Sequence, residues 1–131
     1  MTTADSTTQT RVLAIPSEAP GGLQAIRSGH FGHCAYFTLV TINDGSISSV
    51  ETVGNAPHVE GGCMQPVLLL ADHGVSDIVV SGMGARPLAG FAQVGINVHY
   101  DVEHPVVADV VAAFVAGQVQ PMLPAMTCGG H

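Results

Sequence analysis

The chain has 131 residues, of which 47% are hydrophobic and 10% are charged. This length predicts one domain that buries its own core, and this composition excludes a globally disordered chain. The net charge is −7, lysine is absent and the three cysteines form no CxxC pair, so a nucleic-acid-binding protein and a disulfide framework are both disfavoured.

We expect no targeting signal at the amino terminus. Residues 1–10 are mostly polar, and we expect them to form a disordered tail. No apolar run has the length of a membrane helix, and no basic segment followed by an apolar one marks a signal peptide. We therefore expect a cytoplasmic protein that does not associate with a membrane.

The first half of the chain has the pattern of three strands. Residues 11–16 are apolar and rich in β-formers, which predicts a buried strand, and a glycine-containing loop follows at 17–35. Residues 36–42 alternate in polarity and lead into the turn signal Asn-Asp-Gly at 43–45. Residues 46–53 are therefore predicted to be the returning strand of a β-hairpin.

In the second half, helical and strand patterns alternate. Apolar residues at helical spacing predict a helix over 63–74, and the short apolar run at 77–82 predicts a buried strand. A helix is predicted over 83–95, with a proline tolerated in its first turn, then a strand over 97–102 and a helix over 105–116.

This order, β-β-β-α-β-α-β-α, predicts an α/β fold with a mixed five-stranded sheet and flanking helices. The domain would span residues 11–117, and residues 118–131 would form an irregular tail. The hairpin and right-handed crossovers make all strands except the second run in one direction. Four loops then open at the same sheet edge, where open α/β sheets bind ligands: 17–35, 54–63, 82–86 and 102–105.

The first of these loops contains the sequence GHFGHC. His30, His33 and Cys34 are donors that bind transition metals, and Gly29 and Gly32 allow a backbone to approach a ligand closely. A structural interpretation stays open, in which the histidines bind backbone carbonyls and the buried cysteine begins a strand.

The second loop contains the sequence HVEGGC. Here Gly62 precedes Cys63 at a predicted helix start, where the helix dipole and free N–H groups favour a thiolate. One alternative is a glycine-rich turn with an inert thiol. Another is a metal- or thiol-dependent enzyme that uses His58, Glu60 and Cys63.

A third segment, SGMGARP, joins a strand to a helix. Gly82 and Gly84 at a helix start predict an anion-binding pocket, and Arg86 is one of only three arginines. The segment lacks both the GxGxxG spacing and a P-loop lysine, so a tight strand-to-helix turn is equally consistent. His104 follows the last predicted strand at the same edge and has no assigned role.

Most enzyme classes lack support in these motifs. There is no HExxH motif and no cluster of carboxylates at strand ends, as a zinc hydrolase or a magnesium nuclease would need. Soft donors, glycine-rich walls and an anion-binding helix start favour a bound, negatively charged metal cluster with sulfide in a protein that is not an enzyme. A regulatory interaction module is a third interpretation.

Four segments resemble, in order and spacing, the dinitrogenase iron–molybdenum cofactor biosynthesis family, which includes NifX-like and NifB C-terminal-like small proteins: RVLAIP, GHFGHCAYF, HVEGGCMQPVLLLADHGV and DIVVSGMGARPLAGFAQVGINV. The similarity spans about residues 11–117. It implies a ribonuclease-H-like three-layer fold without nuclease activity. It also implies a carrier or scaffold that binds, stores or transfers an iron–sulfur or iron–molybdenum type cluster.

The resemblance also places the site. It implies five metal ligands: His30, His33, Cys34, His58 and Cys63. It implies a glycine-rich pocket around the cluster, with one arginine: Gly29, Gly32, Gly62, Gly82, Gly84 and Arg86. We expect a monomer or a homodimer that exchanges its cluster with donor or acceptor proteins.

Overall fold

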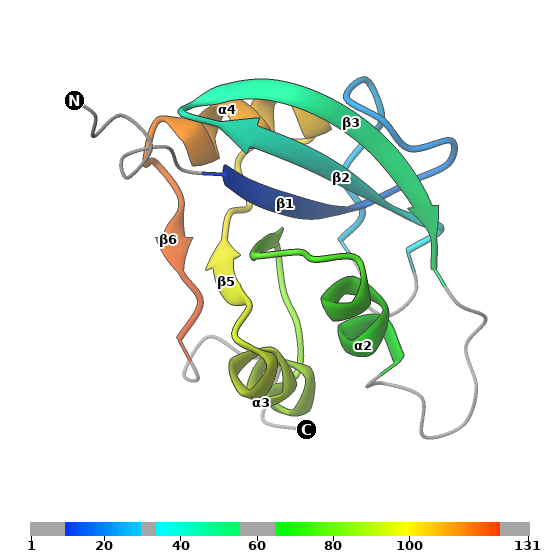
Figure 1. The fold of residues 1–131 in the computed structure, drawn as a ribbon. Coiled ribbons are helices and arrows are strands. Elements are labelled where there is room, and N and C mark those ends of the chain that lie inside the picture. The colour runs from blue at the N-terminus through cyan, green and yellow to red at the C-terminus, as the bar shows by residue number, and fades with distance from the viewer. Residues whose placement is uncertain (1–9, 30–33, 56–64, 124–131) are drawn as a thin grey trace.

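The structure is a computed structural model, and it describes residues 10–29, 34–55 and 65–123. Within these segments six strands form one sheet (Figure 1): β1 (Thr10–Ser17), β2 (Tyr36–Asn43), β3 (Ser46–Gly54), β4 (Asp77–Val80), β5 (Asn97–Tyr100) and β6 (Gln120–Pro121). The same segments contain three helices: α2 (Gln65–Asp72), α3 (Ala85–Val94) and α4 (Val107–Val115). Every predicted helix and strand is present, with boundaries that differ by a few residues.

The strand directions agree with the predicted topology. The sheet order is β3-β2-β1-β4-β5-β6. β2 is antiparallel to both β1 and β3, whereas β4 is parallel to β1 and β5 is parallel to β4. Strands β1, β3, β4 and β5 therefore end at one edge of the sheet, which we call the carboxyl edge. The segments that follow Ser17, Gly54, Val80 and Tyr100 begin there.

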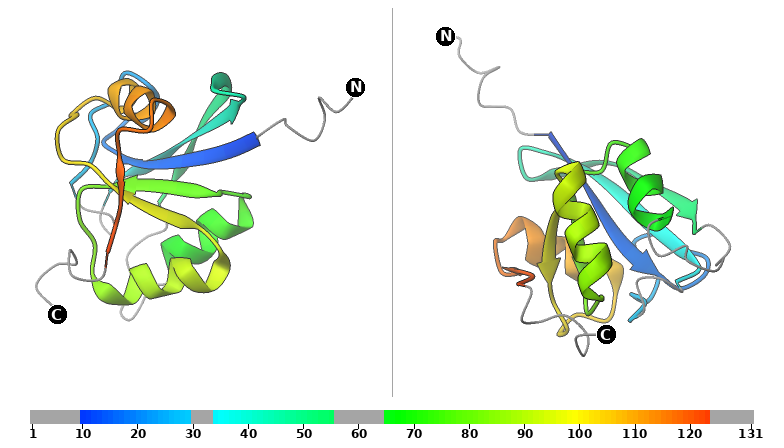
Figure 2. Two further views of the ribbon diagram at one scale, coloured as in Figure 1. Left: turned by 90° about the vertical axis from the view of Figure 1, so that its left-hand side faces the viewer. Right: turned by 90° about the horizontal axis from the view of Figure 1, so that it is seen from below.

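The molecule has three layers. α2 and α3 cover one face of the sheet and α4 covers the other (Figure 2). The alternation of side chains along each strand produces this arrangement. In β1, Ala14 faces the cluster that contains α2 and α3, while Leu13 and Ile15 face the cluster that contains α4.

The prediction of a five-stranded sheet is wrong, because β6 adds a sixth strand. β6 lies inside residues 118–131, which were predicted to be irregular, and it pairs antiparallel with β5. A strand of two residues leaves no alternating pattern in the sequence. Pro121 cannot donate a backbone hydrogen bond, and this is tolerated because β6 is the outermost strand of the sheet.

The predicted hairpin turn is confirmed. Asp44 and Gly45 join β2 to β3 with positive φ angles of 50° and 84°. Two consecutive residues with positive φ form the type I′ turn that matches the twist of the paired strands. This turn lies at the sheet edge opposite the carboxyl edge.

Candidate functional site

The predicted ligand loops lie only partly within the described residues. Five of the eleven predicted site residues are described: Gly29, Cys34, Gly82, Gly84 and Arg86. The remaining six lie outside the described residues: His30, Gly32, His33, His58, Gly62 and Cys63. The geometry of the site is therefore built from the ends of the loops and from the segments beside them.

The end of the first loop lies against the segment that follows β4. The backbone N–H of Ser28 donates to the carbonyl of Pro16 over 2.8 Å, which returns the loop to the end of β1. A Cβ atom placed on Gly29 would lie 3.8 Å from Oγ of Ser81, the first residue after β4. Two of the three predicted site segments therefore meet at the carboxyl edge.

The second loop departs from a point beside Cys34. The backbone N–H of Asn55, the residue after β3, donates to the carbonyl of Ala35 over 3.1 Å. The side-chain Nδ2 of Asn55 donates to the carbonyl of Cys34 over 3.0 Å and lies 3.6 Å from its Sγ. The described ends of the two ligand loops are thus adjacent.

The Cys34 thiol belongs to the core. Its residue is 4% exposed and packs in the cluster that contains Phe37 and Met83. Burial raises the pKa of this thiol to about 11, although hydrogen bonds from the backbone of Ser17 and from Asn55 act in the opposite direction. The thiol is protonated at neutral pH, so a metal could bind this sulfur only by displacing its proton.

The start of α3 faces the carboxyl edge. Gly84 is its N-cap residue, with φ −76° and ψ 170°, and no side chain caps the helix. Its first turn contains no acidic residue; Pro87 is buried there and Arg86 is exposed. The dipole of α3 favours an anion at this end of the helix.

Sequence reasoning missed a polar cluster at the same edge, made by Arg27, Asp101 and His104. Nη1 of Arg27 lies 3.1 Å from Oδ2 of Asp101 and also donates to the Asp101 carbonyl. Both side chains are less than a tenth exposed. Nδ1 of His104 lies 3.0 Å from Oδ1 of Asp101, and the backbone N–H of His104 donates to Oδ2 over 3.2 Å.

This cluster joins the first loop to the segment between β5 and α4. The backbone N–H of Arg27 also donates to the carbonyl of Pro105 over 2.7 Å, and Ile26 forms a β-bridge with Val106. Residues 27 and 101 are too far apart in sequence for a spacing rule. The chain contains only three arginines and no lysine, and this scarcity was the one signal in the sequence that Arg27 has a specific partner.

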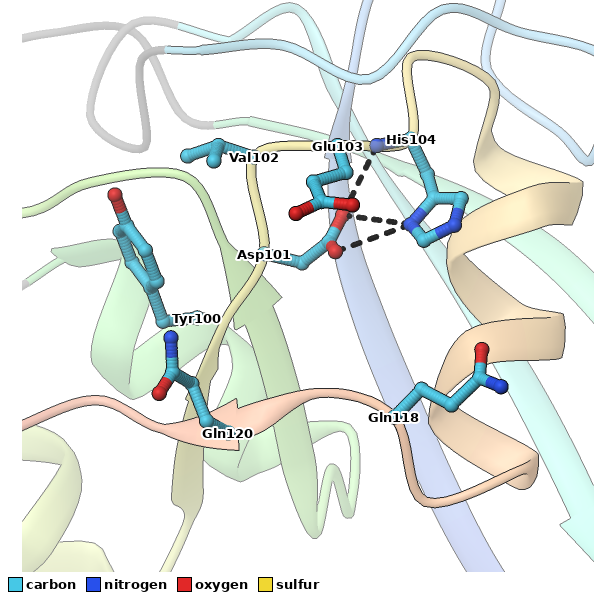
Figure 3. A pocket seen from close by; sticks show the side chains of 7 residues that line it. All are labelled: Tyr100, Asp101, Val102, Glu103, His104, Gln118 and Gln120. Carbon is cyan, nitrogen blue, oxygen red and sulfur yellow. Dashed lines mark hydrogen bonds and ion pairs between the residues drawn. The ribbon is translucent and has the colours of Figure 1, made fainter.

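A polar pocket of about 440 Å³ lies between this segment and β6 (Figure 3). Seven residues line it: Tyr100, Asp101, Val102, Glu103, His104, Gln118 and Gln120.

The described part of the chain contains no group of three or more histidine, cysteine, aspartate or glutamate side chains that could hold a metal ion. None of the described helices is long and apolar enough to span a bilayer.

Comparisons with known proteins give one consistent result. A family model described as "Dinitrogenase iron-molybdenum cofactor" matches residues 11–117. An uncharacterized protein of Methanocaldococcus jannaschii is 30% identical over 95 residues, which cover 71% of this chain and 80% of that protein.

Two solved structures share the fold. The crystal structure of a protein designated PH0822 has a TM-score of 0.73 at 31% identity, and the match covers 85% of this chain and 96% of the other. The apo form of the orange protein from Desulfovibrio gigas has a TM-score of 0.74 at 25% identity, with 87% of this chain and 94% of the other covered.

Proposed function

The chain belongs to the dinitrogenase iron–molybdenum cofactor family, and we propose that it binds, stores or transfers an iron–sulfur or molybdenum-containing cluster as a carrier or scaffold. The cluster is its cargo, and the protein performs no catalysis on it. We also assign the three-layer architecture to the ribonuclease-H-like folds. The partners are proteins that donate the cluster or accept it.

The convergence of the loop ends is the main support for this proposal. Cys34 lies beside Asn55, and Gly29 lies beside Ser81, so three segments that are distant in sequence meet at the carboxyl edge. Ligands bind at this edge in open α/β sheets. The positive end of the α3 dipole suits a cargo with net negative charge.

Two glycines give independent support. Neither Gly29 nor Gly84 has a positive φ angle. A Cβ atom on Gly29 would be 3.8 Å from Ser81, and one on Gly84 would be 3.7 Å from Pro87; both are ordinary contacts. Neither conformation nor crowding by the described residues requires glycine here, whereas close approach of a ligand to the backbone would.

We propose that the cluster is held by the loop donors, which are His30, His33, His58 and Cys63, with Cys34 as a further ligand. Gly29, Gly32, Gly62, Gly82, Gly84 and Arg86 would line the pocket. The two cysteines are not equivalent in this scheme. The Cys34 proton must be displaced before the sulfur can bind, whereas Cys63 lies just before α2, near a helix start that favours a thiolate.

Anaerobic reconstitution with iron and sulfide tests the proposal. We expect visible charge-transfer absorption in the wild type, and a loss of most of it in Cys63→Ser and in the double variant with Cys34→Ser. Cys128→Ser is the matched control, because that thiol is outside the ligand set, and it should reconstitute like the wild type. Unchanged absorption in the double variant would refute the ligand assignment, and no absorption in the wild type would refute cluster binding.

A further inference from the structure

The two outermost strands of the sheet differ in how well they are protected against pairing. β6 has two residues, one of them a proline, and is too short to pair with a further strand. β3 has nine residues, and all of them except Val53 are exposed (Figure 1). It contains no lysine or proline, the residues that commonly protect an edge strand. No described strand lies beyond β3, so it is an open edge.

The backbone of β3 presents a regular set of hydrogen-bonding groups at this edge. The N–H of Asn55 donates to the carbonyl of Ala35, and this pair continues the register of β3 with β2. Hydrogen-bonded and non-hydrogen-bonded pairs alternate along an antiparallel ladder, so residues 51 and 53 bond to β2. Three residues point their N–H and C=O groups away from β2: Val50, Thr52 and Gly54.

The side chains of β3 differ between its two faces. Ile47 and Val50 lie opposite β2 residues of the cluster that contains α4, so both point to the α4 side of the sheet. They are 45% and 38% exposed. Glu51 lies opposite Leu39 and points to the side of α2 and α3. A strand next to β3 therefore meets apolar side chains on one face and a carboxylate on the other.

Charge decides which kind of strand fits this edge. The chain has a net charge of −7, and two of its three arginines, Arg11 and Arg27, already contact buried aspartates. Antiparallel pairing of two copies of β3, centred on the outward groups, would put both Glu51 carboxylates on the same face near the twofold axis. They would repel each other. A strand with a basic residue opposite Glu51 gains an attraction instead, so the edge favours a basic partner over a second copy.

We propose that β3 binds, by strand addition, an extended segment of a partner protein in which basic and apolar residues alternate. The basic side chains face Glu51, the apolar ones lie beside Ile47 and Val50, and the two backbones pair. β3 ends at Gly54, directly before the second ligand loop, so the bound segment extends to the carboxyl edge. The identification of this partner as a cluster donor or acceptor rests on the proposed function, whereas the binding to β3 does not.

The probe is a short capped peptide of alternating lysine and valine, added to the full-length ¹⁵N-labelled protein without a cluster. Amide hydrogen exchange is measured residue by residue. The amides of Val50, Thr52 and Gly54 should exchange rapidly in the free protein, because they point away from β2. Saturating peptide should slow them by about tenfold or more. The amides of Glu51 and Val53 bond to β2 in both states and are internal references.

Pairing of the two backbones is tested separately from charge. The same peptide, N-methylated on the amides that would pair, keeps its lysines and should give no protection. Val50→Pro removes one outward N–H and no bond to β2, so the fold should be preserved, which the backbone spectrum verifies. We expect it to weaken peptide binding by about 5- to 10-fold.

A charge reversal tests the role of Glu51. Glu51→Lys should weaken binding of the lysine peptide by about 5- to 10-fold and should strengthen binding of a peptide with glutamate in place of lysine. Asp72→Lys is the matched control, because it makes the same charge change at an exposed position of α2. It should change the affinity by no more than about twofold.

Four results would overturn the proposal. These are no protection of β3 at saturating peptide, equal protection by the N-methylated peptide, and equal weakening by Glu51→Lys and Asp72→Lys. The fourth is protection of Val50 and Thr52 that rises with protein concentration in the absence of peptide, since this would show that β3 pairs with a second copy. Because no cluster is present, the outcome is independent of the reconstitution experiment.

Discussion

Cys34 illustrates what a local motif can predict about a single residue. Two histidines and a cysteine within five positions indicate a metal site, and that pattern is visible in the sequence. Whether the thiol faces solvent depends on the packing of Phe37 and Met83 around it, which is a property of the folded chain. The sequence therefore predicted the place of Cys34 at the carboxyl edge, while the protonation state of its thiol became apparent only from burial.

The raised pKa of Cys34 makes stability depend on pH in a defined direction. The thiol binds its proton up to about pH 11 when folded, against 9.0 as the ordinary value. Between these values the unfolded chain releases the proton first, so the stability contribution is complete below pH 9 and is lost as the pH rises to about 11. The loss is at most about 3 kcal/mol.

Urea unfolding of the wild type and of Cys34→Ala, from neutral pH to about 11, measures this loss. The difference between their unfolding free energies should shrink steadily over the upper part of this range. Every ionisable group other than Cys34 is present in both proteins, so its contribution cancels in the difference. A difference that stays constant with pH would show that the buried thiol titrates normally.

At the scale of elements, one carboxylate connects three strands at the edge opposite the proposed site. Asp77, at the start of β4, is fully buried and contacts Nε of Arg11 from β1 at 3.2 Å and Nε2 of His99 from β5 at 3.0 Å. Ser76 and Asn97 also donate to it. Burial alone would raise the pKa of Asp77, but the hydrogen bonds from His99 and Ser76 and the charge of Arg11 outweigh it and lower the pKa below 3.8.

Replacement of this carboxylate should therefore destabilise the sheet. Asp77→Asn removes the charge that Arg11 and His99 face, and we expect a loss of about 2 kcal/mol at neutral pH. The pKa is lowered by folding, so the stabilisation is present above pH 3.8 and is lost as the pH falls through the folded-state pKa. Urea unfolding of both proteins should show their difference narrowing in acid.

Asp72→Asn provides the control for this substitution, because it makes the same chemical change at an exposed position of α2. Its effect should stay within about 0.5 kcal/mol. Equal effects of the two substitutions would show that the contacts of Asp77 do not stabilise the sheet.

Periodicity predicted most elements but could not predict their polar connections. Alternation and helical spacing gave the strands and helices within a few residues of their ends, because each pattern extends over most of its element. β6 was missed because two residues form no pattern. The contacts of Asp77 with Arg11 and of Arg27 with Asp101 join residues distant in sequence, which spacing alone cannot pair.

At the scale of the whole molecule, the strand directions bring the proposed binding segments together. The crossover rule and the hairpin were enough to predict that four loops open at one edge, and the pairing of the strands confirms it. The resemblance of the sequence to the cofactor family is confirmed over residues 11–117. The ligand set itself remains a prediction, because four of its five members lie outside the described residues.

The most direct test of the cluster-carrier function is metal and sulfide analysis, together with a visible absorption spectrum, of protein purified without oxygen. We predict iron, with or without molybdenum, in stoichiometric amounts with acid-labile sulfide, and charge-transfer bands that disappear on exposure to air or a chelator. Protein that contains neither metal nor sulfide, and that stays colourless after anaerobic reconstitution, would contradict the proposed function.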